Sequence, residues 1–530
     1  PPSANGHPGI HHVLARTIKD TICRYKTMKG FCVPRKAGWD THGLPVELGV
    51  EKEMGITKDD IGKSVSIEEY NAHCRSNVMK FTAEWENLSR LMGYWVDMKR
   101  PYITYENYYI ESVWWLLHNL YSQGLIYKGY TIQPYSPAAG TGLSSHELNM
   151  PGCYRDVKDT TVTAMFRMKS PNGAFNTNWG ETFFMAWTTT PWTLPSNTAL
   201  CVGPKIDYVL VNTFNPYTAK PISVIMAEAR VASYFNPAGA EASMDTYEKV
   251  GKTLPYRIVA RFKGTELENL EYEQLFAYVN PGEGAFRVIL GDYVSTEDGT
   301  GIVHIAPTFG ADDAFVAKKA GVPALMLIDK NGNKRPMVDL NGRFYRLEDL
   351  DEEFKQKSMN VSLYKTYAGR YVKNAYDATL TDKDETLDIS ICMELKSAGL
   401  AFRIEKQVHN YPHCWRTDKP ILYYPLDSWF IRSTAKKERM FELNKNIKWK
   451  PQSTGTGRFG KWLENLNDWN LSRSRFWGTP LPIWRSENGE EICISSIEEL
   501  YNEIEKSVKA GNMKSNPFKE KGFTPGDYSD

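Results

Sequence analysis

The sequence lacks the features that mark membrane, disulfide-stabilised and strongly basic proteins. It holds 8 cysteines in 530 residues without any C-x-x-C pair, and a chain of this length needs no disulfide bonds to stabilise a core. It has no signal-peptide pattern and no apolar run long enough to span a bilayer. We therefore expect reduced thiols, a cytoplasmic location and no membrane partner. The formal net charge of +1 means that any nucleic-acid partner must be bound by local basic patches.

The length of the chain and the changes in texture along it predict an α/β protein of more than one domain. With 42% hydrophobic and 24% charged residues the composition is globular, and 530 residues exceed what one core usually serves. Short β-rich runs bounded by Gly, Pro and Asn fill residues 156–405. We expect one domain made of residues 1–155 and 406–530, interrupted by this β-rich insertion. Helices are predicted over residues 13–27, 67–92 and about 105–123.

Three segments outside the insertion combine residue types that bind nucleotides and amino acids. Pro1–His12 is a Gly/His loop before a helix, whose free N–H groups attract phosphate and whose imidazoles can donate to phosphoryl oxygens. Gly38–Glu47 holds an Asp and a His suited to an ammonium group and a nucleotide. Asp468–Pro480 holds two Arg for phosphate and a Trp beside Gly for an apolar wall. Each segment alone is more simply a turn, a loop that satisfies its own backbone, or an aromatic core edge.

Together the three segments resemble the signature motifs of class I aminoacyl-tRNA synthetases. The first is similar to the HIGH loop of that family, the second to its GWDxHGLPVE segment and the third to SRxRxWGxPxP. The resemblance covers essentially the whole chain. Within the subgroup that acts on branched aliphatic amino acids, His42–Glu47 and Trp477–Pro482 are most similar to the isoleucyl enzymes. A valyl or leucyl enzyme is an alternative, and the wording of these segments argues against it.

The resemblance implies a Rossmann-type parallel-sheet catalytic domain that activates isoleucine with ATP and Mg²⁺ and transfers it to the tRNA for isoleucine. It implies a monomeric ligase of protein biosynthesis. By position, Asp40 would hold the amino group of isoleucine, and Pro1 and Trp477 would line the pocket for its side chain. The chain reads Gly-Ile-His-His at Gly9–His12 where the family has His-x-Gly-His, so only His12 is in its family position. The other residues implied for the isoleucine, ATP and adenylate site, with catalytic roles for the two adjacent histidines, are Asn5, Gly6, His11, His12, His42 and Gly43.

Two segments of the insertion, Trp187–Asn197 and Gly299–Asp313, carry hydroxyls, a His and carboxylates. Threonines on a strand usually reflect β propensity, and a loop Asp is usually a cap. The segments nevertheless resemble the editing domain of the same family, in which hydroxyls would orient a water against an ester and a carboxylate would hold an α-ammonium. Asp313 is preferred to Asp312 for that carboxylate, and Thr188, Thr189 and Asp313 would be catalytic. The implied editing residues are Thr188, Thr189, Thr190, Asn197, His304 and Asp313.

Physical chemistry explains why an enzyme for isoleucine needs such a second site. Valine lacks one methylene of isoleucine, and this difference is worth only about 1–3 kcal/mol in a pocket, a general magnitude for these enzymes and not one derived from this chain. A hydrolytic site that accepts valine and excludes isoleucine by size completes the discrimination.

Three features of the family are absent from the sequence. Zinc-binding C-x-x-C knuckles of many relatives would fall at Ser136–Ala139 and Cys414–Thr417, where one cysteine of four is left, so we expect no zinc and no other metal site. The KMSKS loop of the family is missing. Asn512–Ser515 is similar to part of it, but this segment is better explained as solvated lysine-rich surface. The strand expected before Pro1 is missing as well. We therefore expect a fragment cut short at both ends and not competent as a ligase alone. The alternative function is a stand-alone tRNA-binding or trans-editing hydrolase.

Overall fold

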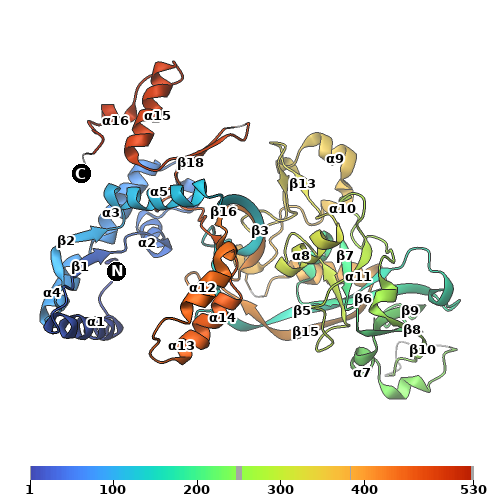
Figure 1. Ribbon diagram of the computed structural model, residues 1–530. Helices are drawn as coiled ribbons and strands as arrows, with labels where there is room; N and C mark the ends of the chain where they lie inside the picture. Colours follow the sequence, from blue (N-terminus) through green and yellow to red (C-terminus); the bar gives the residue numbers. More distant parts are fainter. Residues whose placement is uncertain (1, 246, 248–252, 382, 487, 527–530) are drawn as a thin grey trace. The chain divides into compact units, whose positions relative to one another are not determined.

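The computed structural model describes residues 2–245, 247, 253–381, 383–486 and 488–526. The chain folds into two compact units, one made of Pro1–Gly129 with Ser428–Asp530 and the other of Tyr130–Asp427 (Figure 1). Helices are mixed with parallel and antiparallel strand pairs, which confirms the α/β class. The unit boundaries do not coincide with the expected domain boundaries at 155/156 and 405/406. Those rest on sequence texture alone, so the division into catalytic and editing domains stays a prediction.

The first unit is mainly helical and carries short strands. The helices predicted over residues 13–27 and 105–123 are present, but the single helix predicted over residues 67–92 is wrong, because the chain forms two helices there. Between them the Phe81 amide donates to the carbonyl oxygen of Ala4 (3.1 Å), outside either helix. The helices of this unit are α1 (Ile10–Met28), α2 (Leu44–Met54), α3 (Ile67–Val78), α4 (Thr82–Leu91), α5 (Asn107–Ser122), α12 (Lys437–Asn444), α13 (Ser453–Thr456), α14 (Arg458–Glu464), α15 (Ile497–Lys509) and α16 (Pro517–Glu520). Its strands are β1 (Lys36–Trp39), β2 (Asp97–Ile103), β17 (Trp469–Asn470), β18 (Ile483–Arg485) and β19 (Glu491–Cys493).

A parallel pairing of β1 with β2 positions the segment that follows β1. Gly38 lies opposite Tyr102 in this pair. A Cβ at Gly38 would lie 2.3 Å from the Tyr102 ring, so only glycine allows this close approach. Trp39, the last residue of β1, is buried and packs with Ala4 and Trp85. The end of β1 is therefore fixed against the loop that precedes α1.

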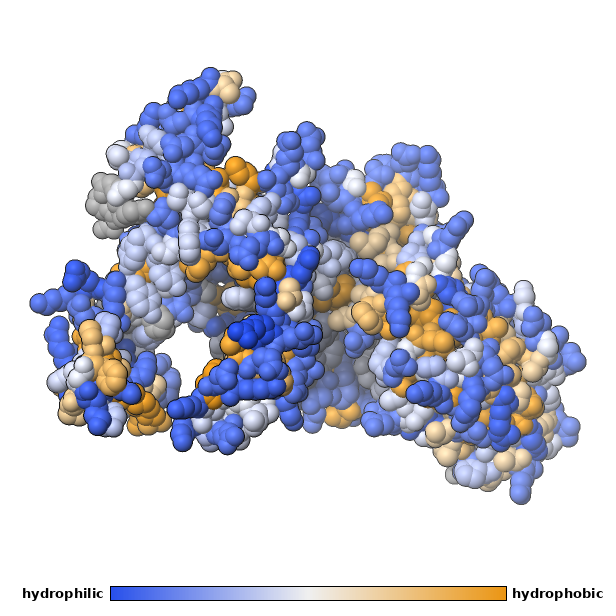
Figure 2. All heavy atoms as spheres, in the orientation of Figure 1, coloured by the Kyte–Doolittle hydropathy of each residue, from blue (hydrophilic) through white to orange (hydrophobic). Residues whose placement is uncertain are grey.

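Helix α1 leaves an apolar stripe on the surface of the first unit (Figure 2). The side chains of this stripe recur every three or four residues, the spacing of one face of an amphipathic helix. No helix in the described part of the chain combines the length and the apolarity that a membrane crossing needs. The exposed members of the stripe are Ile10, Leu14, Ile18, Ile22, Tyr25 and Met28.

The second unit is built around a six-stranded sheet of order β10-β8-β9-β6-β5-β15 and a three-stranded sheet of order β11-β7-β12. β6 pairs with β9 in parallel, and β5 pairs with β15 in a long antiparallel ladder. The strands that belong to this unit or enter it are β3 (Ile126–Ser136), β4 (Thr141–Gly142), β5 (Tyr154–Arg167), β6 (Glu181–Thr188), β7 (Ala199–Val202), β8 (Asp207–Phe214), β9 (Pro221–Ala227), β10 (Arg257–Lys263), β11 (Arg287–Leu290), β12 (Ile302–Ile305), β13 (Leu327–Ile328), β14 (Lys334–Arg335), β15 (Ala401–Pro412) and β16 (Leu422–Ile431). Its helices are α6 (Ser145–Leu148), α7 (Val231–Tyr234), α8 (Ala311–Ala320), α9 (Glu352–Ser358), α10 (Val361–Tyr364) and α11 (Leu387–Ser397).

Both segments predicted for editing include residues of strands in these two sheets. β6 ends at Thr188 and leads into the 3-10 turn η3 (Pro191–Ser196). β12 pairs antiparallel with β7, which places His304 opposite Leu200. The buried core of the unit includes side chains from both sheets and from η3. The residues predicted for editing therefore lie on these strands, on this turn and on α8, or at their ends.

Candidate functional site

The Gly/His segment of the first unit places its two adjacent histidines, His11 and His12, in the first turn of α1. The amide of Gly9 donates to Nδ1 of His12 (2.9 Å), so the neutral imidazole of His12 carries its proton on Nε2. The ring of His12 lies 4.6 Å from Trp85 and 3.7 Å from His11. Burial, followed by the neighbouring charge of His11, lowers the pKa of His12. His12 is therefore a neutral donor beside a helix N-terminus, while His11 is exposed.

The rest of this loop is tied to the protein through its backbone. The indole N–H of Trp85 donates to the carbonyl oxygen of Gly6 (2.8 Å), next to the partly buried Asn5. The amide of Asp40 donates to the carbonyl oxygen of Pro2 (2.9 Å). The loop before α1 and the segment after β1 therefore lie side by side. Pro1, which was expected to line the pocket for isoleucine, lies outside the described residues.

The segment after β1 meets Trp477 from the far end of the sequence. The indole N–H of Trp477 donates to the carbonyl oxygen of Thr41 (2.7 Å), and its ring lies edge-to-face with His42 at 5.4 Å. Trp477 is 8% exposed, whereas the carboxylate of Asp40 faces solvent. Burial lowers the pKa of His42, and the nearby Asp40 opposes this effect. Gly43 follows with a φ of 113°, a conformation that favours glycine, and α2 begins after it.

A buried ion cluster that the sequence reasoning missed holds Trp477 in place. One carboxylate oxygen of Glu47 accepts the amides of Phe476 (3.1 Å) and Trp477 (2.9 Å). The other accepts Nε of Arg475 (2.6 Å), and the same guanidinium also binds Glu51. Glu47 is 1% exposed. The guanidinium expected to contact phosphate is therefore already paired with two carboxylates, and the exposed Arg473 is the other arginine of the motif.

The Thr-rich segment of the second unit forms a chain of hydrogen bonds that ends at His304. The Thr190 amide donates to Oγ1 of Thr188 (3.1 Å), and half-buried Thr189 lies between them. Oγ1 of Thr193 donates to the carbonyl oxygen of Thr190 (2.8 Å) and lies 3.1 Å from Nε2 of His304. Thr193 was not among the predicted residues, although it lies within the segment that predicted them. The hydroxyls and the imidazole therefore form one connected group.

His304 is buried in a neutral state. Burial lowers the pKa of its imidazole to about 4. Since the hydroxyl of Thr193 donates to Thr190, Nε2 is the donor toward Thr193, and Nδ1 of His304 is left as an acceptor. Within the described residues Nδ1 has no hydrogen-bond partner. A buried polar atom without a partner is uncommon in folded proteins.

Asp313 and Asp312 are adjacent but differ in environment. Asp313 is the third residue of α8, and its Oδ2 accepts the amide of Ala306 (2.9 Å), two residues after His304. Burial, with a smaller effect of the Asp312 charge, raises the pKa of Asp313 to about 7. Asp312 is exposed. A substrate ammonium beside Asp313 would favour the charged carboxylate and lower its pKa.

Asn197 braces the fold behind this group. Its Oδ1 accepts the hydroxyl of Tyr272 (2.6 Å), and its Nδ2 donates to the carbonyl oxygens of Ala199 (2.8 Å) and Ile305 (3.4 Å). Asn197 is 3% exposed. Its amide is used within the protein, and its expected place in the Thr-rich wall stays a prediction. It fixes the end of η3 to β7 and β12.

The residues at the degraded zinc knuckles do not fit a metal. Ser136, Ala139 and Thr417 occupy three of the four ligand positions, and Cys414 is buried. Oγ of Ser136 accepts the amide of Ala139 (3.2 Å). In the ranges that the structure describes, no group of three or more His, Cys, Asp or Glu side chains could hold a metal ion. The absence of zinc stays a prediction.

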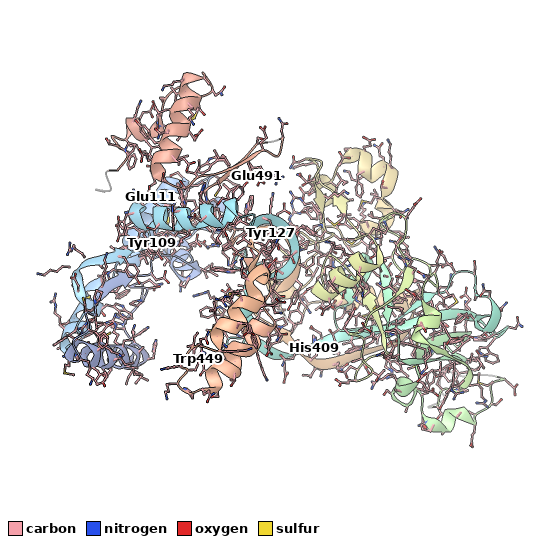
Figure 3. All side chains as sticks on the ribbon, in the orientation of Figure 1. Tyr109, Glu111, Tyr127, His409, Trp449 and Glu491 are labelled. Atoms are coloured by element: carbon pink, nitrogen blue, oxygen red, sulfur yellow. The ribbon has the colours of Figure 1, made fainter. Side chains whose placement is uncertain are left out.

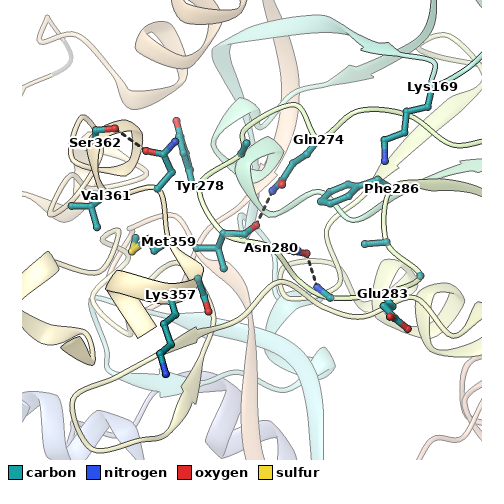
Figure 4. Close-up of a pocket in the computed structure, with 17 residues that line it drawn as sticks. Lys169, Gln274, Tyr278, Asn280, Glu283, Phe286, Lys357, Met359, Val361 and Ser362 are labelled. Carbon is teal, nitrogen blue, oxygen red and sulfur yellow. Dashed lines mark hydrogen bonds between the residues drawn. The ribbon is translucent and has the colours of Figure 1, made fainter. Parts of the chain in front are cut away.

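A pocket of about 1040 Å³ opens on the second unit (Figure 4). Its lining contains none of the predicted site residues. The polar groups in it pair with one another, as Gln274 does with the carbonyl oxygen of Val279 (2.9 Å) and Ser362 with Asn360 (2.8 Å). Its lysine Lys169 lies 3.9 Å from Glu271. Its other lysine, Lys357, lies 2.5 Å from Glu353.

Comparisons with a family model and with curated proteins match this chain over nearly all of its length. A family model described as tRNA synthetases class I (I, L, M and V) matches residues 1–523. Curated proteins named isoleucine–tRNA ligase match it from Bacteroides fragilis (71% identity, 100% of this chain and 46% of that protein), Porphyromonas gingivalis (69%, 100% and 46%) and Cytophaga hutchinsonii (60%, 96% and 45%). The chain spans about half the length of the curated relatives it matches. A solved editing domain of the P. knowlesi cytosolic leucyl-tRNA synthetase aligns with 48% of this chain and 98% of its own at 12% identity, with a TM-score of 0.29 that is too low to assign a fold.

Proposed function

The chain belongs to the class I tRNA synthetases of the I, L, M and V group, and from this premise we propose that it carries the amino-acid activation site and the editing site of an isoleucine–tRNA ligase. Its substrates would be isoleucine, ATP with Mg²⁺ and the tRNA for isoleucine. The observation that carries the proposal is the contact of Trp477 with Thr41 and His42, which brings a residue from a distant segment to the short segment that holds the exposed Asp40.

The first unit supplies the groups that activation requires. In this step an oxygen of the isoleucine carboxylate bonds to the α-phosphorus of ATP, and pyrophosphate leaves. Exposed Asp40 is suited to the amino group, and the ring of Trp477 to the aliphatic side chain. Nε2–H of His12 and the free amides at the start of α1 are suited to phosphate oxygens. Asn5, Gly6, His11 and Gly43 complete the proposed site.

The second unit supplies the groups that editing requires. Water adds to the ester carbonyl of valyl-tRNA, and the ester bond breaks to release valine and the ribose hydroxyl, which takes a proton. The hydroxyls of Thr188, Thr189 and Thr190 are suited to orienting that water, with His304 beside them. Asp313 is suited to the α-ammonium, because an ammonium in a partly desolvated pocket needs a carboxylate. We include a cytoplasmic monomer in the proposal, and the eight unpaired cysteines support a reducing compartment.

Calorimetric titration of isoleucine into the chain tests the activation site. We expect isoleucine to bind, and Asp40→Ala to abolish the binding because the ammonium loses its carboxylate. Asp97→Ala, which removes another exposed carboxylate of the same unit, is the matched control and should bind as the wild type does. Equal binding by Asp40→Ala, or no isoleucine binding by the wild type, would contradict this part of the proposal and favour a hydrolase without ligase activity.

A further inference from the structure

A buried cluster of charged side chains lies behind the Thr-rich turn of the second unit. Nζ of Lys373 lies 2.7 Å from Oδ2 of Asp159 and 3.6 Å from Oδ2 of Asp388. Nε2 of His409, labelled in Figure 3, lies 3.2 Å from the same oxygen of Asp159. The four side chains are between 4% and 23% exposed. They come from β5, β15, the start of α11 and the loop before α11, so the cluster joins elements that are distant in the sequence.

One oxygen of this cluster reaches the editing segment directly. Oδ1 of Asp388 accepts the amide of Trp192 at 2.9 Å. Trp192 is the second residue of η3, and the first amides of a helical turn have no partner within the turn. A carboxylate is a strong acceptor for such amides. Asp388 therefore caps η3 from a different part of the chain.

The turn that Asp388 caps controls both halves of the proposed editing site. Thr190 accepts the amide of Thr193 (3.0 Å) as well as its hydroxyl, and that hydroxyl contacts His304. On the other side, the ring of Trp192 packs edge-to-face on Phe309 at 5.0 Å, in the segment that leads to Asp313. A shift of the Trp192 backbone would move the hydroxyls and the packing under α8 together.

Charge compensation explains how a carboxylate can be kept at this place. Burial raises the pKa of Asp388 to about 6, and the ammonium of Lys373 opposes this rise. Burial also disfavours the charge of Asp159, but His409 and Lys373 outweigh it and bring the pKa of Asp159 to about 2. An unpaired buried carboxylate would be costly, so Lys373 is the partner that makes the cap possible. Tyr411, whose ring lies 4.9 Å from Nζ of Lys373, completes the surroundings.

We propose that Asp388 is a positioning residue for editing, whose carboxylate fixes the Pro191–Ser196 turn so that Thr190, Thr193 and His304 keep one arrangement around the ester. The inference rests on the proposed hydrolysis of valyl-tRNA. Asp388 itself touches neither the hydroxyls nor His304, and it acts through the amide of Trp192. Its loss is expected to lower the turnover of bound ester more than the binding of tRNA.

The test compares two neutral side chains of similar shape at this position. Asp388→Asn keeps an oxygen for the Trp192 amide, whereas Asp388→Leu has none, and both leave Lys373 paired with Asp159. Deacylation of preformed valyl-tRNA should show kcat within about threefold of the wild type for Asp388→Asn. For Asp388→Leu, kcat should fall at least about tenfold, with KM within about threefold, because a buried amide is left unsatisfied. Hydrogen exchange over residues 188–197 should become faster in Asp388→Leu alone.

Several results would overturn the inference. Equal kcat for Asp388→Leu and the wild type would show that the cap does not position the site. A loss in Asp388→Asn as large as that in Asp388→Leu would show that the acceptor oxygen is not what matters. Asp377→Ala, which removes a carboxylate that accepts from neighbouring Thr379, should leave kcat unchanged. If the wild-type chain hydrolyses no valyl-tRNA, the proposed function fails. Hydrogen exchange tests the cap independently of activity, and an unchanged exchange rate over residues 188–197 in Asp388→Leu would show that Asp388 does not fix the turn.

Discussion

Replacing Asp313 with asparagine removes the carboxylate proposed to hold the α-ammonium of valyl-tRNA but keeps an oxygen for the amide of Ala306. That amide lies 2.9 Å from Oδ2 in the wild type, so the fold around α8 should persist. A hydrogen bond to a charged group is worth about 1.5–3 kcal/mol. Since about 1.36 kcal/mol corresponds to a factor of ten in rate, kcat/KM for deacylation should fall about 10- to 150-fold.

The pH dependence of the same variant provides a second readout. Burial raises the pKa of Asp313 to about 7, so the carboxyl of the free protein is mostly neutral below that pH. In the wild type kcat/KM should rise as pH increases through about 7, and Asp313→Asn should lack this rise. The folded-state pKa lies above the ordinary value of 3.8, so the wild type loses stability as pH rises from about 4 to about 7. The free energy of unfolding of Asp313→Asn should therefore increase relative to that of the wild type over that pH range.

The assay is deacylation of preformed valyl-tRNA, with circular dichroism as the control for folding. Asp312→Asn is the matched control, because it removes the neighbouring exposed carboxylate. Its kcat/KM should stay within about threefold of the wild type. A value for Asp313→Asn within twofold of the wild type, or a larger loss in Asp312→Asn, would refute the assignment.

Three further predictions concern other parts of the structure. Glu47→Ala should lower the free energy of unfolding of the first unit by about 3–5 kcal/mol, measured by urea titration. The substitution breaks a buried ion pair with Arg475 and leaves two backbone amides without an acceptor. A loss below about 1 kcal/mol would contradict this prediction. Burial lowers the pKa of His304 to about 4, so the stability of the wild type should fall, relative to that of His304→Gln, as pH decreases from about 6.5 to about 4. Unchanged relative stability over this range would count against a buried neutral imidazole. Metal analysis of the purified chain should find no zinc at Cys414, and one equivalent of zinc that disappears in Cys414→Ser would show the prediction to be wrong.

Local patterns in the sequence were sufficient to predict much of the fold. The Gly/His loop before α1 and the β-rich texture of the insertion depend on neighbouring residues, which sequence reasoning can use directly. The helix over residues 67–92 was wrong for a non-local reason, because its break coincides with a hydrogen bond from Phe81 to Ala4. Whether an acceptor from another segment interrupts a helical pattern cannot be predicted from the pattern itself.

The same limit applies to the candidate sites. Motif position singled out Asp40, His42 and Trp477, and the structure places His42 and Trp477 in contact, with Asp40 in the same short segment. Motif position did not predict that Glu47 accepts the amide of Trp477 or that Asp388 accepts the amide of Trp192. Both are contacts between segments that are distant in the sequence. Asp388 lies far from any motif, and although Glu47 lies within one, its residue type alone does not reveal its partner in another segment.

The most direct test of the account is the deacylation rate of valyl-tRNA and of isoleucyl-tRNA, both on the tRNA for isoleucine, by this 530-residue chain. The account predicts that the valyl ester is hydrolysed at least about tenfold faster than the isoleucyl ester, because one methylene is worth about 1–3 kcal/mol in a pocket that excludes by size. Equal rates for the two esters, or no hydrolysis of valyl-tRNA above the rate in buffer, would contradict it.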